Sequence, residues 1–359
     1  MSIDNKNDNI EILRGIAIIF VLIAHFVIII PDELREKYLS FLKYINAETG
    51  VDLFFVISGY LMGVTFLAKT EYAELKLRDT FIFYRKRILR LLPSAYLWAF
   101  ITLCLGVYFN SRGSLLWIDN TSLMNNFFSS LAFMRNFTEY IQPTHLGYYW
   151  SLSVEMQFYF FLPIVWFLLK RKYFWYLICL LLLIGFIWRP GGFHWIFLRF
   201  DGLLVGLMLW KLTSVENWRD YVKYIVPETK INLLFTLVVS FCLVLTIPKL
   251  FINASVPGLY NGLISLICGY CVLISVYKEN ILINAEAISK IFIFIGSISY
   301  SLYLVHLPIW IMYKEIVLNV GFNLPNYVYC LFSFLIIVII SYLNKVYIED
   351  KFVKKYHFK

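Results

Sequence analysis

Charged residues are scarce in this chain. Only 15% of its 359 residues are Asp, Glu, Lys or Arg, whereas a soluble domain carries about 25%. Apolar residues make up 60%, and the mean hydropathy is +0.72. This is more apolar surface than one compact core can bury, so much of it must face lipid. The composition excludes a water-soluble globule and predicts an all-α integral membrane protein.

The chain also lacks a polar segment long enough for a large soluble domain. At roughly 20 residues per crossing, its apolar runs predict about ten membrane-spanning helices in a single membrane domain, residues 1–359. No cleavage site of small residues follows the first run, so we expect that run to stay in the mature protein. The expected spans lie near 10–30, 50–68, 93–110, 149–169, 173–188, 196–213, 231–247, 259–277, 291–313 and 327–347.

Cysteines are absent from the expected loops, where a secreted protein would place its disulfides. All six fall in apolar stretches: Cys104, Cys179, Cys242, Cys268, Cys271 and Cys330. Cys268 and Cys271 have C-x-x-C spacing, but no second Cys or His pair accompanies them. We therefore expect apolar side chains on a helix face and no metal site.

The net charge of +9 does not predict a nucleic-acid partner, because most basic residues lie beside apolar runs. With the N-terminus inside, the cytoplasmic segments hold 22 Lys and Arg and the opposite segments hold 8. Such an excess marks the cytoplasmic side. It predicts a multi-pass protein of the cell membrane, in contact with lipids, with both termini in the cytoplasm.

Two segments outside the spans have helical patterns of their own. Residues 81–92, FIFYRKRILRLL, predict a short basic amphipathic helix on the cytoplasmic face, after which Pro93 begins the third span. On the outer side, Phe127–Phe137 is apolar but too short to cross, which predicts a re-entrant or interfacial helix. There is no internal repeat of the kind common in transporters.

Ionisable residues inside spans are costly and usually functional. Arg14 and His25 lie eleven residues apart on the first expected span. That separation is about 20° beyond three helical turns and about 16 Å of rise. The two side chains therefore share one helix face, with Arg14 near the cytoplasm and His25 in the outer half.

Polar residues of other expected spans lie near the same outer depth as His25. They are Asp52, Glu155, Arg199, Asp201 and His306. An imidazole with an ordinary pKa near 6.5 can accept a proton from a hydroxyl nucleophile at neutral pH. A carboxylate, either Glu155 or Asp52, could orient that imidazole and stabilise its charged form. The cluster predicts general-base chemistry near the outer face.

Each of these residues also has a structural interpretation. Asp52 could equally well cap the second span. His306 could pack rather than orient a substrate, and Arg199 and Asp201 fit a structural ion pair slightly better than a catalytic role. His25 could hydrogen-bond a neighbouring helix. Its position on the same helix face as Arg14 favours catalysis.

A second cluster is cationic and lies on the cytoplasmic side: Arg14, Arg85, Lys86, Arg87 and Arg90. Arg87 and Arg90 lie 60° apart around a helix, so their guanidinium groups can bind phosphate together. A donor with phosphates at one end and a long arm fits both clusters, and coenzyme A is such a molecule. The same arginines would also serve as topology signals and headgroup anchors.

Five motifs occur in order along nearly the whole chain. They are EILRGIAIIFVLIAHF, GVDLFFVISGYLM, RKRILRLLP, YYWSLSVEMQFYFFLP and SYSLYLVHLP. Together they resemble the membrane acyltransferase-3 family of integral membrane O-acyltransferases, with its R-x10-H opening, R-x-x-R helix and W-S-L-S-V-E block. Each motif alone is weak, but five in order are specific.

The resemblance implies transfer of an acyl group, usually acetyl, from cytoplasmic acetyl-CoA to a hydroxyl of a sugar or lipid-linked glycan outside. This would be polysaccharide modification by O-acetylation. The implied catalytic residues are His25 as general base and Glu155, and the implied donor-binding residues are Arg14, Arg87 and Arg90. From their positions in the two clusters, we add Asp52 to the catalytic candidates and Arg85 to the donor-binding ones. The candidate substrate contacts are Trp150, which could stack on a sugar, Ser153, Tyr300 and His306.

Two departures from the family pattern matter. Met156 replaces a second acidic residue, and the C-terminal hydrolase-like domain of some members is missing, so we expect the chain to act alone or with a partner.

The alternative function is a proton-coupled transporter or flippase of a polar or glycan solute. The missing duplicated half and paired broken helices argue against it. The acceptor, the acyl group and a homo-oligomer are left open.

Overall fold

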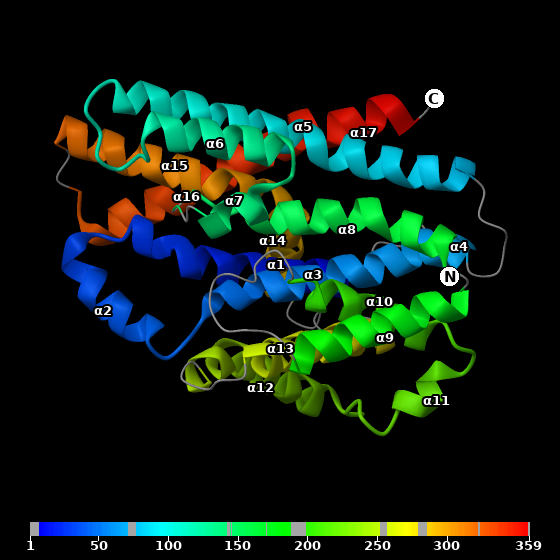
Figure 1. The fold of residues 1–359 in the computed structure, drawn as a ribbon. Helices are drawn as coiled ribbons and strands as arrows, with labels where there is room; N and C mark the ends of the chain where they lie inside the picture. The colour runs from blue at the N-terminus through cyan, green and yellow to red at the C-terminus, as the bar shows by residue number, and fades with distance from the viewer. Residues whose placement is uncertain are drawn as a thin grey trace. The chain divides into compact units, whose positions relative to one another are not determined.

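The computed structural model describes residues 7–70, 77–141, 144, 146–169, 171–187, 199–251, 257–278, 286–321 and 324–357. All regular secondary structure in these ranges is helical, as expected (Figure 1). The chain divides into two compact units. The first comprises residues 1–24, 42–80 and 161–299, and the second comprises residues 25–41, 81–160 and 300–359.

The first unit is built mainly from the following helices. They are α1 (Asp8–His25), the 3₁₀ helix η2 (Ala47–Thr49), α3 (Gly50–Met62), the π-helix η3 (Gly63–Leu67), α4 (Ala68–Thr70), α9 (Arg171–Ile187), α10 (Asp201–Thr213), α11 (Trp218–Val222), α12 (Lys230–Leu250), α13 (Pro257–Tyr277) and α14 (Glu286–Ser297). His25, the last residue of α1, belongs to the second unit.

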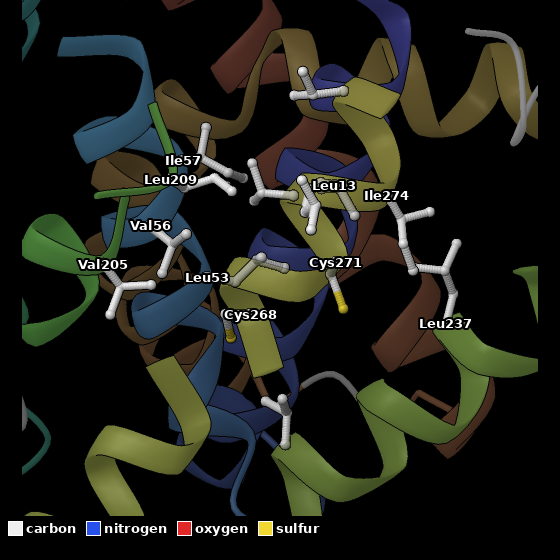
Figure 2. Close-up of a cluster of buried hydrophobic side chains, with 14 of the residues drawn as sticks. Leu13, Leu53, Val56, Ile57, Val205, Leu209, Leu237, Cys268, Cys271 and Ile274 are labelled. Atoms are coloured by element: carbon white, nitrogen blue, oxygen red, sulfur yellow. The ribbon is translucent and has the colours of Figure 1, made fainter. Parts of the chain in front are cut away.

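The core of the first unit is apolar. Figure 2 shows Leu13 of α1, Leu53 of α3, Val205 of α10 and Cys268 of α13 meeting in one buried cluster. Cys271 belongs to the same cluster, and both thiols are unpaired. The C-x-x-C pair therefore packs as apolar side chains between helices.

Helices α3 and α10 cross at unusually close range, and α13 packs against both. A Cβ atom on Gly59 would lie 2.1 Å from the carbonyl oxygen of Leu203, and one on Gly206 would lie 2.2 Å from that of Val56. Only glycine fits at either position, as in many close helix pairs in membranes. The crossing holds the first turns of α3 and α10 beside each other.

The second unit contains the remaining helices. They are η1 (Phe26–Ile28), α2 (Asp32–Leu42), α5 (Leu77–Asn110), α6 (Asn120–Leu131), α7 (Arg135–Ile141), the first part of α8 (Tyr149–Leu168), α15 (Ser299–Val320), α16 (Asn326–Asn344), the π-helix η5 (Lys345–Glu349) and α17 (Asp350–His357). α2 was not predicted from the sequence.

Eight helical stretches within the described ranges are long and apolar enough to cross a membrane, rather than the expected ten. They cover 8–28, 47–70, 78–110, 149–168, 230–250, 259–277, 299–320 and 326–354. The expected spans 173–188 and 196–213 correspond to α9, with 17 residues, and α10, with 13. Residues 188–198 lie outside the described residues, and with them parts of both expected spans.

The expected ninth span, 291–313, is wrong in its boundaries. α14 ends at Ser297 and α15 begins at Ser299, so the apolar pattern continues across a break between two helices. Gly296 lies at this break, where a Cβ atom would be 1.8 Å from the carbonyl oxygen of Glu11 on α1. Close packing on α1 thus accompanies an interruption that hydropathy does not reveal.

The expectation that Pro93 starts a new helix is also wrong. Residues 81–92 are continuous with the third span in α5, with Pro93 inside the helix. Proline frees a backbone carbonyl, which in membranes must be satisfied by neighbours. For Pro93 this is the carbonyl of Leu89. Nearby carbonyls of α5 also accept hydrogen bonds from two other helices, because Tyr300 donates to the Leu91 carbonyl (2.7 Å) and Tyr149 donates to the Ala95 carbonyl (2.8 Å).

The external segment forms two short helices instead of the single one expected over Phe127–Phe137. α6 ends at Leu131 and α7 begins at Arg135, with Phe133 between them at φ 52°. Asp119 caps α6 by accepting hydrogen bonds from the Ser122 hydroxyl (2.6 Å) and amide (3.0 Å). These bonds hold the pKa of the Asp119 carboxyl below its ordinary value.

Candidate active site

Two histidines form the centre of the candidate site, and both belong to the second unit. Nδ1 of His25, at the end of α1, lies 2.9 Å from Nε2 of His306 on α15. The rings are stacked, with centroids 5.1 Å apart and planes at 24°. His25 is partly buried and His306 is fully buried. The two histidine motifs, which lie 281 residues apart in the sequence, therefore meet in the fold.

Aromatic side chains enclose His306. The rings of Tyr148, Tyr303 and Trp310 have centroids 5.5, 5.9 and 5.8 Å from its own. Nδ1 of His306 lies 3.0 Å from the carbonyl oxygen of Leu302, one turn earlier on α15. Both ring nitrogens of His306 are thus engaged, and the imidazole has one fixed orientation.

Hydrogen bonds tie α15 to the first turn of α8 beside this pair. The Tyr148 hydroxyl donates to the Leu304 carbonyl (2.8 Å), and the Tyr303 hydroxyl donates to the Tyr148 carbonyl. The Ser151 hydroxyl lies 2.6 Å from that of Tyr303. The WSLSVE block and the C-terminal motif therefore form one polar surface.

Further along α8 the polar contacts continue toward the basic segment of α5. The Tyr159 hydroxyl donates to the Glu155 carboxylate. The guanidinium of Arg87 lies over the Tyr159 ring, 4.8 Å from its centroid, and over Phe83 at 5.7 Å. Ser151, Glu155 and Tyr159 follow at i, i+4 and i+8, so they share one face of α8.

Tyr300 makes the matching connection from α15. It lies six residues before His306, about 1.7 helical turns, and Tyr303 is three residues from each, so successive members of the three are neighbours on the helix surface. Its hydroxyl donates to the Leu91 carbonyl on α5, and it interacts electrostatically with Glu155 and Arg90. We use the name polar column for His306, Tyr303, Tyr300, Ser151, Glu155, Tyr159, Arg87 and Arg90, which connect the histidine pair to the basic segment of α5.

A buried network lies beside the polar column. The Ser301 hydroxyl donates to the carboxylate of Glu349 in the π-helix η5. The Asn344 side-chain amide donates to Ser301 (2.8 Å) and Ser94 (3.1 Å), and its oxygen accepts from the Trp98 indole (3.0 Å). π-Helical turns are rare and occur frequently at functional sites. This network joins α5, α15 and α16, and its Glu349 interacts electrostatically with Tyr300.

The remaining predicted donor-binding residues lie in different surroundings. Arg14 is on α1 in the first unit, where it forms an ion pair with Glu11 at 3.5 Å. Arg85 and Arg90 are partly buried on α5, and Lys86 is exposed. Among the described residues, Arg90 has no hydrogen bond or ion pair.

Asp52, which is buried, and Arg199, which is partly buried, form an ion pair in the first unit, with 2.6 Å between Oδ2 and an Nη atom. Asp201 is buried in the first turn of α10 and interacts electrostatically with Arg199. The N-cap of α3 is Thr49, so Asp52 lies in the first turn but is not the cap. This arrangement supports the ion-pair interpretation of Arg199, with Asp52 as a direct partner.

Trp150 and Ser153 differ in accessibility. Trp150 is partly buried at the start of α8. The Ser153 hydroxyl is fully buried, donates to the Tyr149 carbonyl (3.0 Å) and accepts from the Arg135 amide (3.2 Å). Arg135 is itself buried in an ion pair with Glu139. Burial lowers the pKa of this guanidinium, and the Glu139 charge opposes the shift.

Several residues of the site were not singled out from the sequence. Tyr148, Tyr159 and Tyr303 lie within the quoted motifs but are three of 26 tyrosines, and Glu349 lies beyond the last motif. The spacing of Tyr300, Tyr303 and His306 on one helix face was a usable signal for the first part of the column. Nothing in the sequence indicated that Arg87 would meet Tyr159.

Comparison with known proteins identifies a family. The acyltransferase-3 family, described as "Acyltransferase domain", matches residues 7–344. O-acetyltransferase OatA of Staphylococcus aureus (strain NCTC 8325 / PS 47) is 27% identical over 368 residues, covering 96% of this chain and 56% of that protein. YrhL of Bacillus subtilis (strain 168), provisionally named a peptidoglycan O-acetyltransferase, is 28% identical over 293 residues, covering 73% of this chain and 44% of that protein.

The chain spans little more than half the length of the staphylococcal relative. No solved structure matches it.

Proposed function

Because this chain belongs to the acyltransferase-3 family, we propose that it transfers an acetyl group from cytoplasmic acetyl-CoA to a hydroxyl of a cell-envelope glycan outside the membrane. In this proposal residues 1–359 form one membrane acyltransferase domain. The observation that carries it is the hydrogen-bonded pair of His25 and His306. The polar column connects this pair to the basic segment of α5 within a single compact unit.

His25 is the proposed general base. Its imidazole takes the proton from the acceptor hydroxyl, whose oxygen then attacks the carbonyl carbon of the thioester. A C–O bond forms, the C–S bond breaks, and the imidazolium returns the proton to the departing thiolate. The products are the O-acetylated glycan and free coenzyme A, so protons and electrons balance.

Arg85, Arg87 and Arg90 bind the phosphates of the donor in this proposal. Guanidinium groups are suited to phosphate oxygens, and Arg90 has no hydrogen bond or ion pair within the described ranges. Stacking on Tyr159 restrains Arg87, which lowers the entropy lost when it binds an anion. Glu155 orders this end of the column through Tyr159.

The direction of the column follows from the charge asymmetry of the loops. An excess of Lys and Arg on one side of the expected spans places both termini in the cytoplasm, and either eight or ten spans is an even number. α15 then runs outward, so His306 lies about 9 Å nearer the outer face than Tyr300. The donor enters at the arginines and the acceptor approaches the histidines from outside.

The acceptor proposed is a glycan, because two of the relatives are named for O-acetyl transfer and one name specifies peptidoglycan. Trp150 is the best-placed sugar contact, since it is partly exposed next to Ser151 of the polar column. Tyr300 acts as a member of the polar column. Ser153 acts through the hydrogen bond that it accepts from the Arg135 amide at the start of α7. Asp52 as a catalytic residue and Arg14 as a donor-binding residue stay predictions, which substitution can test.

The proposal is tested with the purified full chain in detergent, radiolabelled acetyl-CoA and peptidoglycan fragments. We expect thiol release and labelled fragments from the wild type and neither from His25→Ala. Tyr313→Phe is the matched control, because it removes one buried hydroxyl contact from α15, to the Tyr329 carbonyl (3.2 Å). Movement of a glycan across sealed vesicles without donor binding would overturn the enzyme in favour of a transporter.

A further inference from the structure

The proton positions on the histidine pair follow from one carbonyl group. The Leu302 oxygen, 3.0 Å from Nδ1 of His306, can only accept a hydrogen bond. Nδ1 of His306 must therefore carry a hydrogen atom. In a neutral imidazole the other nitrogen is then an acceptor, and that nitrogen is Nε2, which faces His25.

His306 is neutral because of where it lies. Its ring is fully buried between Tyr148, Tyr303 and Trp310. No carboxylate of the described residues bonds to either imidazole, and a buried cation without a counter-charge is strongly unfavourable. The titratable groups that face the pair are the hydroxyls of Tyr148, before α8, and Tyr303, on α15. Both hydroxyls donate to backbone carbonyls.

The proton on His25 is then determined as well. Since Nε2 of His306 accepts, Nδ1 of His25 donates, and Nε2 of His25 keeps its lone pair. That atom has no hydrogen-bond partner among the residues the structure describes. The pair thus directs a single basic nitrogen away from His306.

We propose that His306 is a positioning residue that holds His25 in the Nδ1–H tautomer, so that Nε2 of His25 is the catalytic base. The role of His25 as catalytic base rests on the proposed function. The tautomer follows from the hydrogen bonds of His306 alone. His306 takes the place that a carboxylate occupies in a Ser-His-Asp triad, without a negative charge. The proton taken up stays on His25, because moving it to Nε2 of His306 would place an uncompensated cation on a fully buried ring.

The tautomer is tested first without any substrate. The full chain is labelled with ¹⁵N-histidine, and its nitrogen shifts are recorded in lipid at a pH where imidazoles are neutral. We expect two Nδ1–H imidazoles. The signal lost in His25→Ala belongs to His25, and the signal that remains in that variant belongs to His306. In His306→Phe, we expect His25 to lose the Nδ1–H form. A wild-type His25 protonated at Nε2 would overturn the proposal.

Activity supplies a second test, with thiol release from acetyl-CoA as the measurement. His306→Phe keeps a planar ring but removes the acceptor, and we expect kcat to fall by about 100-fold or more. His306→Gln supplies an acceptor oxygen, and we expect it to recover at least about tenfold over the Phe variant. His306→Glu adds a negative charge, which should move the acid limb of the pH profile upward by about one unit.

These outcomes separate the two proposals. An inactive wild type that shows the expected tautomers would overturn the acetyl transfer and leave the positioning role standing. An active wild type, with His306→Phe and His306→Gln both equal to it, would overturn the positioning role alone. If His306→Phe does not fold, His306→Gln and His306→Glu are used instead. An unshifted pH profile of thiol release in His306→Glu would then overturn the proposal.

Discussion

The guanidinium of Arg87 lies over the ring of Tyr159, 4.8 Å from its centroid, and the hydroxyl of that ring donates to the Glu155 carboxylate. The sequence placed Arg87 and Glu155 at opposite ends of the proposed reaction path. In the fold, one tyrosine connects them. The contact makes the basic segment of α5 and the acidic motif of α8 parts of one site, which has consequences for donor binding.

Replacing both Arg87 and Arg90 with Ala should raise KM for acetyl-CoA much more than it lowers kcat. A hydrogen bond to a charged group is worth about 1.5–3 kcal/mol, so we expect a rise of about 100-fold in KM from the two together. Thiol release measured against donor concentration gives both constants. Lys86→Ala on the same helix is the control, because Lys86 is exposed, and its KM should change little. An unchanged KM in the double variant would remove the phosphate role.

The ion pair between Asp52 and Arg199 should act through stability rather than chemistry. Removing one partner of a fully buried pair costs about 3–5 kcal/mol because the other charge stays buried, and we expect a smaller loss here because Arg199 is partly exposed. Asp52→Asn should therefore lower the unfolding temperature in detergent, and Asp52→Asn with Arg199→Met should recover much of the loss. Thiol release per folded molecule should stay near wild type in both. Loss of that activity with an unchanged unfolding temperature would instead assign Asp52 a catalytic role.

The crossing of α3 and α10 should not tolerate a methyl group. Gly206→Ala places a Cβ atom 2.2 Å from the Val56 carbonyl oxygen, so the helices must separate, at a cost of about 1–3 kcal/mol. Gly269→Ala on α13 is the comparison, since its Cβ would meet only a side-chain methyl of Val205, at 2.8 Å. Thermal unfolding should show the larger loss for Gly206→Ala. Equal losses would mean that the crossing is looser than these distances indicate.

The network around Asn344 should be sensitive to losing its central member. Asn344→Ala leaves the Trp98 indole and the Ser94 hydroxyl without their partner, and each unsatisfied buried group costs about 1–3 kcal/mol. Adding Trp98→Phe should recover part of the loss in thermal unfolding, because it removes one unpaired donor. Thr246→Val on α12 is the control, since that hydroxyl bonds only within its own helix. A loss from Asn344→Ala no larger than that of the control would argue against the network.

Hydropathy located most of the long helices, but it failed at breaks and continuations. The boundary at Pro93 was wrong because α5 runs through the proline, which stands inside the helix and not at its start. The ninth span was wrong because 291–313 is apolar on both sides of the turn at Ile298. Hydropathy reports how apolar a segment is. It does not show whether the helix continues through Pro93 or turns at Ile298.

Motif spacing indicated the residues of the site but not their partners. The eleven-residue interval put Arg14 and His25 on one helix, and both lie on α1. A carboxylate was expected to orient His25, whereas the structure pairs it with His306. Spacing constrains residues of one helix. It says nothing about which other helix faces them.

The amino-acid sequence by itself determined that this is a helical membrane protein, because composition and local periodicity depend only on neighbouring residues, and its five ordered motifs identified the acyltransferase-3 family. Tertiary structure decided which histidine orients which, that Tyr159 joins Arg87 to Glu155, and that Asp52 bonds to Arg199. Those pairings depend on helix crossings such as the one at Gly206. A crossing is set by the shapes of two surfaces far apart in the chain, which no local pattern records.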